Sequence, residues 1–193
     1  MDHGQVSSDI ERVVASSEAI QKRVAELAQK VGEDYRGRDL LLVGVLKGAV
    51  MLMADLSRAL DRHVEMDWMA VSSYGSGTKS SGVVRILKDL DRDITNREVL
   101  IVEDIVDTGL TLHWLQSNLE SRGAKSVEIL TMLRKPTAAK VDVKVKYVGF
   151  DIPPDFVVGY GLDFNEKYRN LDFIGVLAKH VYAVSYTHLT LPT

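Results

Sequence analysis

One stretch constrains the fold of this chain more than any other: residues 99–111, which read VLIVEDIVDTGLT. It opens with a continuous aliphatic and β-branched run, typical of a strand buried on both faces of a parallel sheet. Two carboxylates, Glu103 and Asp104, follow where that strand should end, and a glycine flanked by polar residues precedes a helical pattern. Ligands of open α/β sheets bind outside the carboxyl ends of the strands, so this stretch predicts a ligand site as well as a fold class.

The loop of Thr108, Gly109, Leu110 and Thr111 is suited to hold a phosphate. Its backbone N–H groups can converge on an anion, and the start of the following helix adds a favourable partial charge. The neighbouring acids would repel a phosphate alone. That conflict disappears if they accept hydrogen bonds from the hydroxyls of a sugar whose phosphate the loop holds, as in a ribose 5-phosphate. The alternative is a buried strand with an acidic exit turn.

The rest of the chain alternates between strand and helix patterns. Residues 1–9 are polar and expected to be loose, and Ser17 is the expected N-cap of the first helix. Strands are expected at 10–15, 40–46, 64–72, 83–87, 127–133, 141–150 and 171–177, and helices at 17–37, 49–60 and after Thr111. This order predicts an α/β fold, a doubly wound parallel sheet with a small hood subdomain built from other segments.

Composition limits the classes of partner. The 193 residues suffice for one domain with a sizeable core, and a net charge of −3 without a basic stripe argues against nucleic acid. The chain has no cysteine, so disulfides and thiolate metal sites are excluded, and its five histidines are dispersed. No run reaches the ~18 apolar residues of a membrane span, and the start lacks a signal segment, so a cytoplasmic protein is expected.

Residues 99–111 resemble the 5-phosphoribosyl 1-pyrophosphate (PRPP) binding motif of the type I phosphoribosyltransferases. From about residue 10 to residue 182, the chain resembles the hypoxanthine-guanine phosphoribosyltransferase family. Leu46-Lys47-Gly48 matches the family's pyrophosphate loop, where a non-proline cis peptide joins the leucine to the lysine. Ser73-Tyr74 matches its closing loop, so the Gly- and Ser-rich residues 75–82 are expected to form a lid; a hairpin linker is the alternative.

Two further matches concern the base. Lys135 matches the family lysine that bonds the purine's exocyclic oxygen, and residues 155–170, DFVVGYGLDFNEKYRN, match the base-binding segment. The resemblance implies that Phe156 stacks on the purine and that Val157 offers its backbone groups to the purine edge. It also places Asp163 near the purine amino group and a Mg²⁺ water shell, and Arg169 at the pyrophosphate. Without the family, Lys135 is a surface lysine and Phe156 a core aromatic.

The implied activity is purine salvage: hypoxanthine or guanine plus PRPP gives IMP or GMP plus pyrophosphate. Mg²⁺ is the implied cofactor, with Glu103, Asp104 and Asp163 as its expected carboxylates. Asp107 is the expected catalytic residue, accepting a proton from the purine; an N-cap of the next helix is its alternative role. The family also implies a homodimer or homotetramer. Residues 10–182 are expected to form one domain, and residues 183–193, which fit no family pattern, are interpreted as a possible artefact.

Two rival functions differ from this one. A PRPP-sensing regulator that binds RNA would need a basic surface, which the composition does not supply. A transferase for adenine or a pyrimidine is disfavoured by Lys135 together with residues 155–170.

Overall fold

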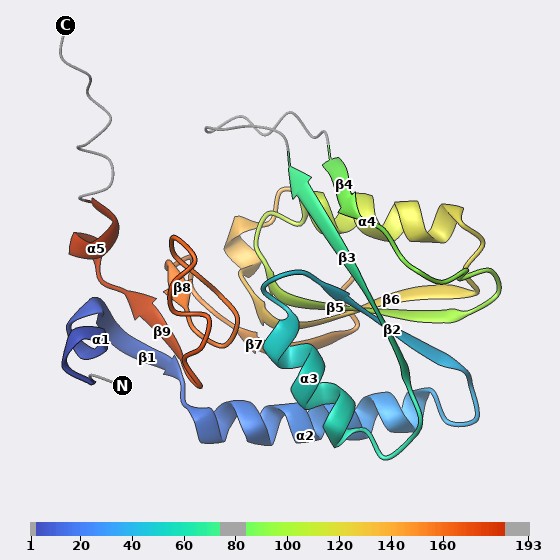
Figure 1. Ribbon diagram of the computed structural model, residues 1–193, viewed down its shortest axis with the longest axis horizontal. Helices are drawn as coiled ribbons and strands as arrows, with labels where there is room; N and C mark the ends of the chain where they lie inside the picture. The colour runs from blue at the N-terminus through green and yellow to red at the C-terminus, as the bar shows by residue number, and fades with distance from the viewer. Residues whose placement is uncertain (1–2, 74–83, 184–193) are drawn as a thin grey trace, which may run out of the picture.

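The computed structural model describes residues 3–73 and 84–183 (Figure 1). In chain order its elements are α1 (His3–Asp9), β1 (Ile10–Ala15), α2 (Ser17–Asp34), β2 (Leu40–Val45), α3 (Val50–Ala59), β3 (Glu65–Ser73), β4 (Val84–Lys88), β5 (Glu98–Val106), α4 (Leu110–Ser121), β6 (Ser126–Arg134), the 3-10 turn η1 (Pro136–Ala138), β7 (Tyr147–Asp151), β8 (Val157–Val158), β9 (Ile174–Leu177) and α5 (Lys179–Ala183). Within these residues no helix is long and apolar enough to cross a membrane.

The central sheet has six strands in the order β4-β3-β2-β5-β6-β7. Five of them are parallel, and β4 is antiparallel to its neighbour β3 at one edge. β2 and β5, far apart in sequence, lie side by side from the Leu40–Glu98 pair to the Gly44–Val102 pair. The predicted α/β sheet is confirmed, with one antiparallel strand added to it.

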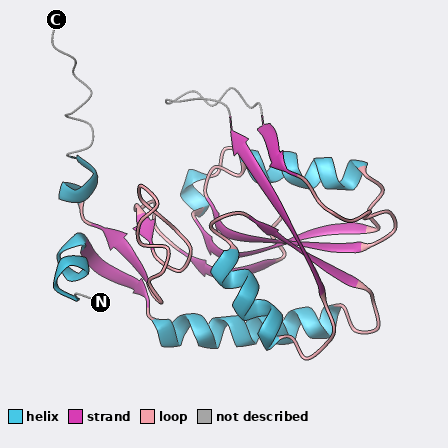
Figure 2. Cartoon of the chain, in the orientation of Figure 1, coloured by secondary structure: helices cyan, strands magenta, loops and turns pink. Residues whose placement is uncertain are grey.

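Helices cover both faces of the central sheet (Figure 2). Alternating side chains of the central strands pack against these helices. Leu40 and Leu42 of β2 join the core formed with α2 and α3, whereas Leu41 and Val43 join the core formed with α4. All four are buried. This two-sided burial explains why the strand sequences are continuous apolar runs.

A second, three-stranded antiparallel sheet has the order β1-β9-β8. We call this sheet, with the connecting residues 159–173, the hood; it lies at one end of the central sheet (Figure 1). β1 comes from the start of the chain and pairs with β9 near its end, for example Ala15 with Ile174. The predicted subdomain of other segments is therefore present.

Several expected boundaries are wrong. Residues 3–9 form helix α1 rather than loose chain, and the end of α1 is tied down because Asp9 accepts hydrogen bonds from Ala178 N (2.7 Å) and the Tyr168 hydroxyl (2.8 Å). The N-cap of α2 is Ser16, whose Oγ accepts from Ala19 N. Residues 141–146 carry the strand-like alternation of valines, yet β7 is only Tyr147–Asp151; Val143 and Val145 pack on the core ahead of it, and Lys146 N donates to Ile129 O of β6 (3.0 Å). The last strand is likewise only Ile174–Leu177.

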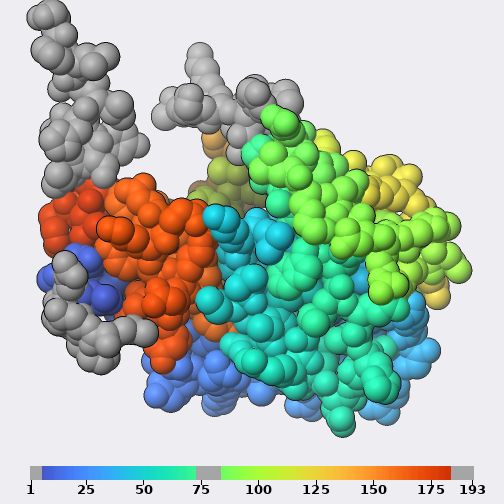
Figure 3. Space-filling model, viewed as in Figure 1, coloured from blue at the N-terminus to red at the C-terminus, as the bar shows by residue number. Residues whose placement is uncertain are grey.

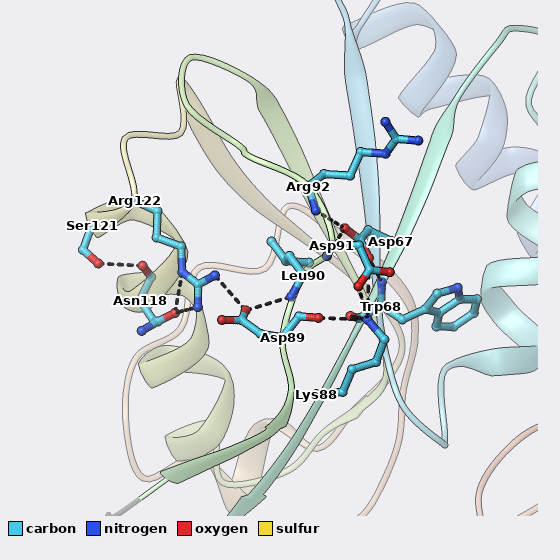
Figure 4. A network of polar contacts seen from close by, with 10 residues as sticks. All are labelled: Asp67, Trp68, Lys88, Asp89, Leu90, Asp91, Arg92, Asn118, Ser121 and Arg122. Atoms are coloured by element: carbon cyan, nitrogen blue, oxygen red, sulfur yellow. Dashed lines mark hydrogen bonds and ion pairs between the residues drawn. The ribbon is translucent and has the colours of Figure 1, made fainter.

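The path of the chain between β4 and β5 is fixed by a buried carboxylate (Figure 4). Asp67 on β3 is only 3% exposed and accepts hydrogen bonds from the backbone N–H groups of Trp68, Asp91 (2.9 Å) and Arg92 (3.2 Å). Asp89, in the same turn, accepts from Arg122 at the end of α4 (2.7 Å). These bonds hold the turn that follows β4 against β3 and α4.

Candidate active site

The sequence-predicted residues gather at one edge of the sheet because neighbouring parallel strands end there. Lys47 and Gly48 follow β2, Asp107 follows β5 and Lys135 follows β6. Ser73 is the last residue of β3, and only its backbone is described; Tyr74 and residues 75–82 lie outside the described residues, so the lid prediction stays a prediction. The prediction that the strand ends at Glu103 and Asp104 is wrong. Both residues lie inside β5, which continues to Val106 because Ile105 and Val106 pair with Leu133 and Arg134.

Three segments from distant parts of the chain touch at this edge. A Cβ placed on Gly48 would lie 1.7 Å from Asp104 Oδ2, so the carboxylate of β5 lies directly on the turn after β2. A Cβ on Gly161, in the hood, would lie 2.0 Å from the carbonyl oxygen of Gly48. In Figure 3 the orange hood lies against the cyan atoms of the β2–α3 region. Only residues without side chains allow this approach.

The cations of the site are already paired with acids. Lys47 Nζ lies 2.9 Å from Glu166 Oε2, and Arg169 Nη2 lies 3.0 Å from Glu166 Oε1 and 3.1 Å from Asp163 Oδ1. Arg169 Nη1 also donates to the carbonyl oxygen of Gly161 (2.7 Å), which fixes the guanidinium beside the Gly48–Asp104 contact. The Arg169 Nε atom is buried and has no partner within the described chain. Charges of both signs therefore converge on this point.

The acidic pair is electrostatically strained. Burial, and the charge of Asp104 beside it, raise the pKa of Glu103. Burial also raises the pKa of Asp104, although hydrogen bonds, including the one from Ile105 N, and the Arg169 charge oppose that rise. A divalent cation or hydroxyl donors at this edge would favour the charged forms of both carboxyls.

The predicted phosphate loop leads into α4 through a left-handed glycine. Gly109 is the N-cap residue at φ 80°, and the Leu110 N–H at the start of the helix donates to Thr108 Oγ1 (3.5 Å), so the N-cap role considered for Asp107 is wrong. Thr108 contributes its carbonyl oxygen to a hydrogen bond from Lys140 N (2.9 Å), while Leu110 and Thr111 open the helix. The first N–H groups of such a helix have no intrahelical partner, which makes this loop a natural place for an anion.

Asp107 and Lys135 form an ion pair, with Oδ2 and Nζ 3.2 Å apart. The Lys135 side chain is 11% exposed, so it is not the solvated surface lysine of the alternative interpretation. Both residues line a pocket of about 400 Å³ together with Gly109 and the segment after β6. The positions expected to exchange a proton with the purine and to bind its oxygen are thus adjacent.

The aromatic residue expected to stack on the base lies in the hood. Phe156 is 42% exposed, so it is not a core aromatic; its ring contacts Phe164 edge-on (5.8 Å between centroids) and Tyr182 at a tilt (5.4 Å). Val157, the next residue, is buried in β8 and pairs with Val176. The ring is therefore held by neighbours and still presents surface to solvent.

Comparisons with known proteins agree with this geometry. The family model of the phosphoribosyl transferase domain matches residues 14–165. The chain is 58% identical over 180 residues to the hypoxanthine-guanine phosphoribosyltransferase of Mycobacterium tuberculosis, covering 90% of this chain and 89% of the relative. The chain belongs to the hypoxanthine-guanine phosphoribosyltransferases.

Solved structures of this family share the fold. A hypoxanthine phosphoribosyltransferase from Staphylococcus aureus superposes with a TM-score of 0.91 at 47% identity, covering 94% of this chain and 99% of that one. A Trypanosoma cruzi hypoxanthine phosphoribosyl transferase, from a study of its oligomeric state and activity, gives 0.87 at 40% identity, covering 93% and 97%. The cis peptide that the resemblance implied between Leu46 and Lys47 is present in this phosphoribosyltransferase.

The carboxylates fit Mg²⁺ only together with a substrate. Among the described residues, no three His, Cys, Asp or Glu side chains lie close enough to hold a metal ion. Mg²⁺ usually keeps several waters and is bound through one or two carboxylates plus substrate phosphates. Glu103, Asp104 and Asp163 supply hard oxygen donors of this kind, so the donor set suits an ion that arrives with a phosphorylated ligand.

Sequence reasoning missed two residues of this phosphoribosyltransferase site. Glu166 pairs with both Lys47 and Arg169, and Tyr182 contacts the ring of Phe156. Glu166 lies inside the segment that resembled the family's base site, but only the folded turn brings it back to Lys47, 119 positions away. Nothing in the sequence around Tyr182 indicates its ring contact.

Proposed function

We propose that this enzyme transfers the phosphoribosyl group of PRPP to hypoxanthine or guanine, giving IMP or GMP and pyrophosphate. The observation that carries the proposal is the convergence of Lys47, Arg169 and Asp104 at the turn after β2, supported by the family of the chain. A substrate with a 5-phosphate, a ribose diol and a pyrophosphate needs amides, carboxylates and cations in this order.

Each part of PRPP has a proposed set of residues. Backbone N–H groups from Thr108 through Gly109 and Leu110 to Thr111 hold the 5-phosphate. Glu103 and Asp104 accept from the ribose hydroxyls. The pyrophosphate meets Lys47, the Gly48 backbone and Arg169, and Ser73 with Tyr74 closes over it.

The reaction is a displacement at C1 of the ribose through an oxocarbenium-like state, so stabilising the leaving pyrophosphate matters more than a strong nucleophile. Lys47 and Arg169 place two positive charges at the leaving group. Asp107 accepts the proton of the purine as the new bond forms. Glu103, Asp104 and Asp163 would hold Mg²⁺ together with the substrate, and the ion would supply further positive charge at the leaving group.

The purine site combines one reader of the 6-oxo group with a stacking face. Lys135 donates to the exocyclic oxygen, Phe156 stacks on the ring, and Val157 offers backbone groups to its edge. Asp163 lies near the amino group of guanine. The buried stem of Lys135 and the exposed face of Phe156 support these two roles.

The test is a turnover screen of the purified protein with PRPP and Mg²⁺ against each nucleobase. Adenine presents an amino group where Lys135 needs an acceptor, and losing a required hydrogen bond in a closed site costs a factor of roughly 10⁴ or more. Lys135→Ala should impair 6-oxopurine use strongly, whereas Lys140→Ala, an exposed lysine of the same pocket wall, should not. Adenine turnover within tenfold of hypoxanthine would reject this assignment of the base site.

The proposal extends to the whole protein. We propose one phosphoribosyltransferase domain over residues 10–182, with the residues after it playing no part in the reaction. The resemblance supports a homodimer or homotetramer, with no nucleic acid or membrane as partner, acting in the cytoplasm. Light scattering coupled to size-exclusion chromatography measures the oligomer, and deletion of residues 184–193 tests the tail.

A further inference from the structure

A carboxylate occupies the place where the two proposed pyrophosphate cations meet. Glu166 binds Lys47 through one oxygen (2.9 Å) and Arg169 through the other (3.0 Å). Lys47 and Glu166 are 67% and 63% exposed, so the bridge lies open to solvent. An anion with two separated oxygens bridging a lysine and an arginine is the geometry that a pyrophosphate would also need.

The turn that positions Glu166 has an unfavourable backbone conformation. Asn165 (φ 50°), Glu166 (φ 61°) and Tyr168 (φ 78°) all have left-handed backbones, although none is glycine. Phe164 and Lys167 exchange backbone hydrogen bonds of 3.1 Å, and the Glu166 N–H donates to Asp163 Oδ2 (2.9 Å). Left-handed non-glycine residues persist only where the surrounding structure enforces them, and they cluster at functional sites.

We propose that Glu166 is an exchangeable counter-ion for the pyrophosphate site: it holds Lys47 and Arg169 in place in the free enzyme, and the pyrophosphate of substrate or product displaces it. The inference rests on the proposed role of these two cations. Glu166 is thus a positioning residue that acts through Lys47 and Arg169, and it sets how tightly both PRPP and pyrophosphate are held.

The competition sets the direction of the effect. Binding pyrophosphate breaks two exposed ion pairs, each of which contributes only a small stabilisation. Removing the Glu166 charge abolishes that cost, while the Asp163 pair with Arg169 and the bond to the Gly161 carbonyl still hold the guanidinium. A gain of roughly three- to tenfold in pyrophosphate affinity follows.

The experiment is calorimetric titration of pyrophosphate with Mg²⁺ into wild type, Glu166→Gln and Glu166→Asp. Glutamine keeps the shape of the side chain and the backbone bond to Asp163 but removes the charge. We expect Glu166→Gln to bind pyrophosphate about three- to tenfold more tightly, and Glu166→Asp to return towards wild type. In steady-state assays the KM for PRPP and the inhibition constant of pyrophosphate should fall together, while the KM for hypoxanthine stays unchanged.

Glu26→Gln is the matched control, because Glu26 is also exposed and also pairs with an arginine, Arg23, but on α2 away from the site. It should leave every constant unchanged. Unchanged or weaker pyrophosphate binding in Glu166→Gln, with wild type binding normally, would overturn the counter-ion role alone. A wild-type protein that does not bind pyrophosphate at all would overturn the proposed function as well.

Discussion

The contact between Gly48 and Asp104 makes a sharp test of the site. A methyl group at position 48 would lie 1.7 Å from Asp104 Oδ2. In Gly48→Ala the carboxylate must therefore move by roughly 1 Å or more, because atoms closer than about 3 Å repel each other strongly. Asp104 cannot keep the position from which it is proposed to bind the ribose.

The size of the effect follows from that displacement. A misplacement of about 1 Å in a reacting site can cost about 100-fold. We expect kcat/KM for PRPP to fall roughly 10- to 100-fold in Gly48→Ala. The clash involves the end of a side chain rather than backbone, so the cost in stability should stay within the ~1–3 kcal/mol of an overpacked site, a few degrees in Tm.

Gly32→Ala is the control for a glycine-to-alanine change. Gly32 lies on α2, and a Cβ there would meet nothing within 4 Å. Alanine in a helix interior stabilises by about 0.5–1 kcal/mol relative to glycine, so Tm should rise while the kinetics stay the same. If Gly48→Ala is folded and keeps its PRPP constants within twofold of wild type, Asp104 does not bind the ribose from this position.

Three further changes test other parts of the molecule. Asp107→Asn should keep the Tm but lose about 100-fold or more in kcat, because asparagine cannot accept the proton; turnover within a few-fold would leave Asp107 only a positioning role. Asp67→Ala should lower the free energy of unfolding in urea by about 1–3 kcal/mol, since the backbone N–H groups of Asp91 and Arg92 lose their acceptor, and a smaller loss would mean that water replaces the carboxylate. Bonds from Ser126 and Arg38 lower the pKa of Glu98, so its stabilisation exists above its unfolded pKa and is lost as pH falls through the lower folded value. Glu98→Gln should therefore flatten the fall in unfolding free energy between about pH 5 and pH 3, and an unchanged slope would contradict this role.

The sheet was predictable because strands buried on both faces require apolar residues at every position. In β2 every residue from Leu40 to Val45 is buried, so an unbroken apolar run is the only pattern the strand can have. The same run in β5 ends in polar groups, which located one edge of the site. Residues 141–146 misled the prediction for a different reason: Val143 and Val145 alternate because they pack on the core, although β7 itself begins only at Tyr147.

The contacts between segments were beyond reach of the sequence. The contact of Gly48 with Asp104 depends on the pairing of β2 with β5, and the contact with Gly161 depends on how the hood lies against the sheet; hydrophobic periodicity encodes neither. Glu166 illustrates the same limit, because its role depends on a left-handed turn of non-glycine residues, which local propensity would reject. Local backbone preferences fail to predict this turn because such preferences are often violated at functional sites, where surrounding contacts compensate for the strain.

The free site is a set of paired charges rather than a field of positive potential. Lys47 and Arg169 share Glu166, Arg169 also meets Asp163, and Lys135 meets Asp107. Binding of a polyanion at these cations would therefore exchange ion pairs instead of forming them anew, and the affinity would be the difference between two sets of interactions. This arrangement suits an enzyme that releases the pyrophosphate of its substrate as a product, because Glu166, which is proposed to yield to the incoming anion, is in place to replace it when it leaves.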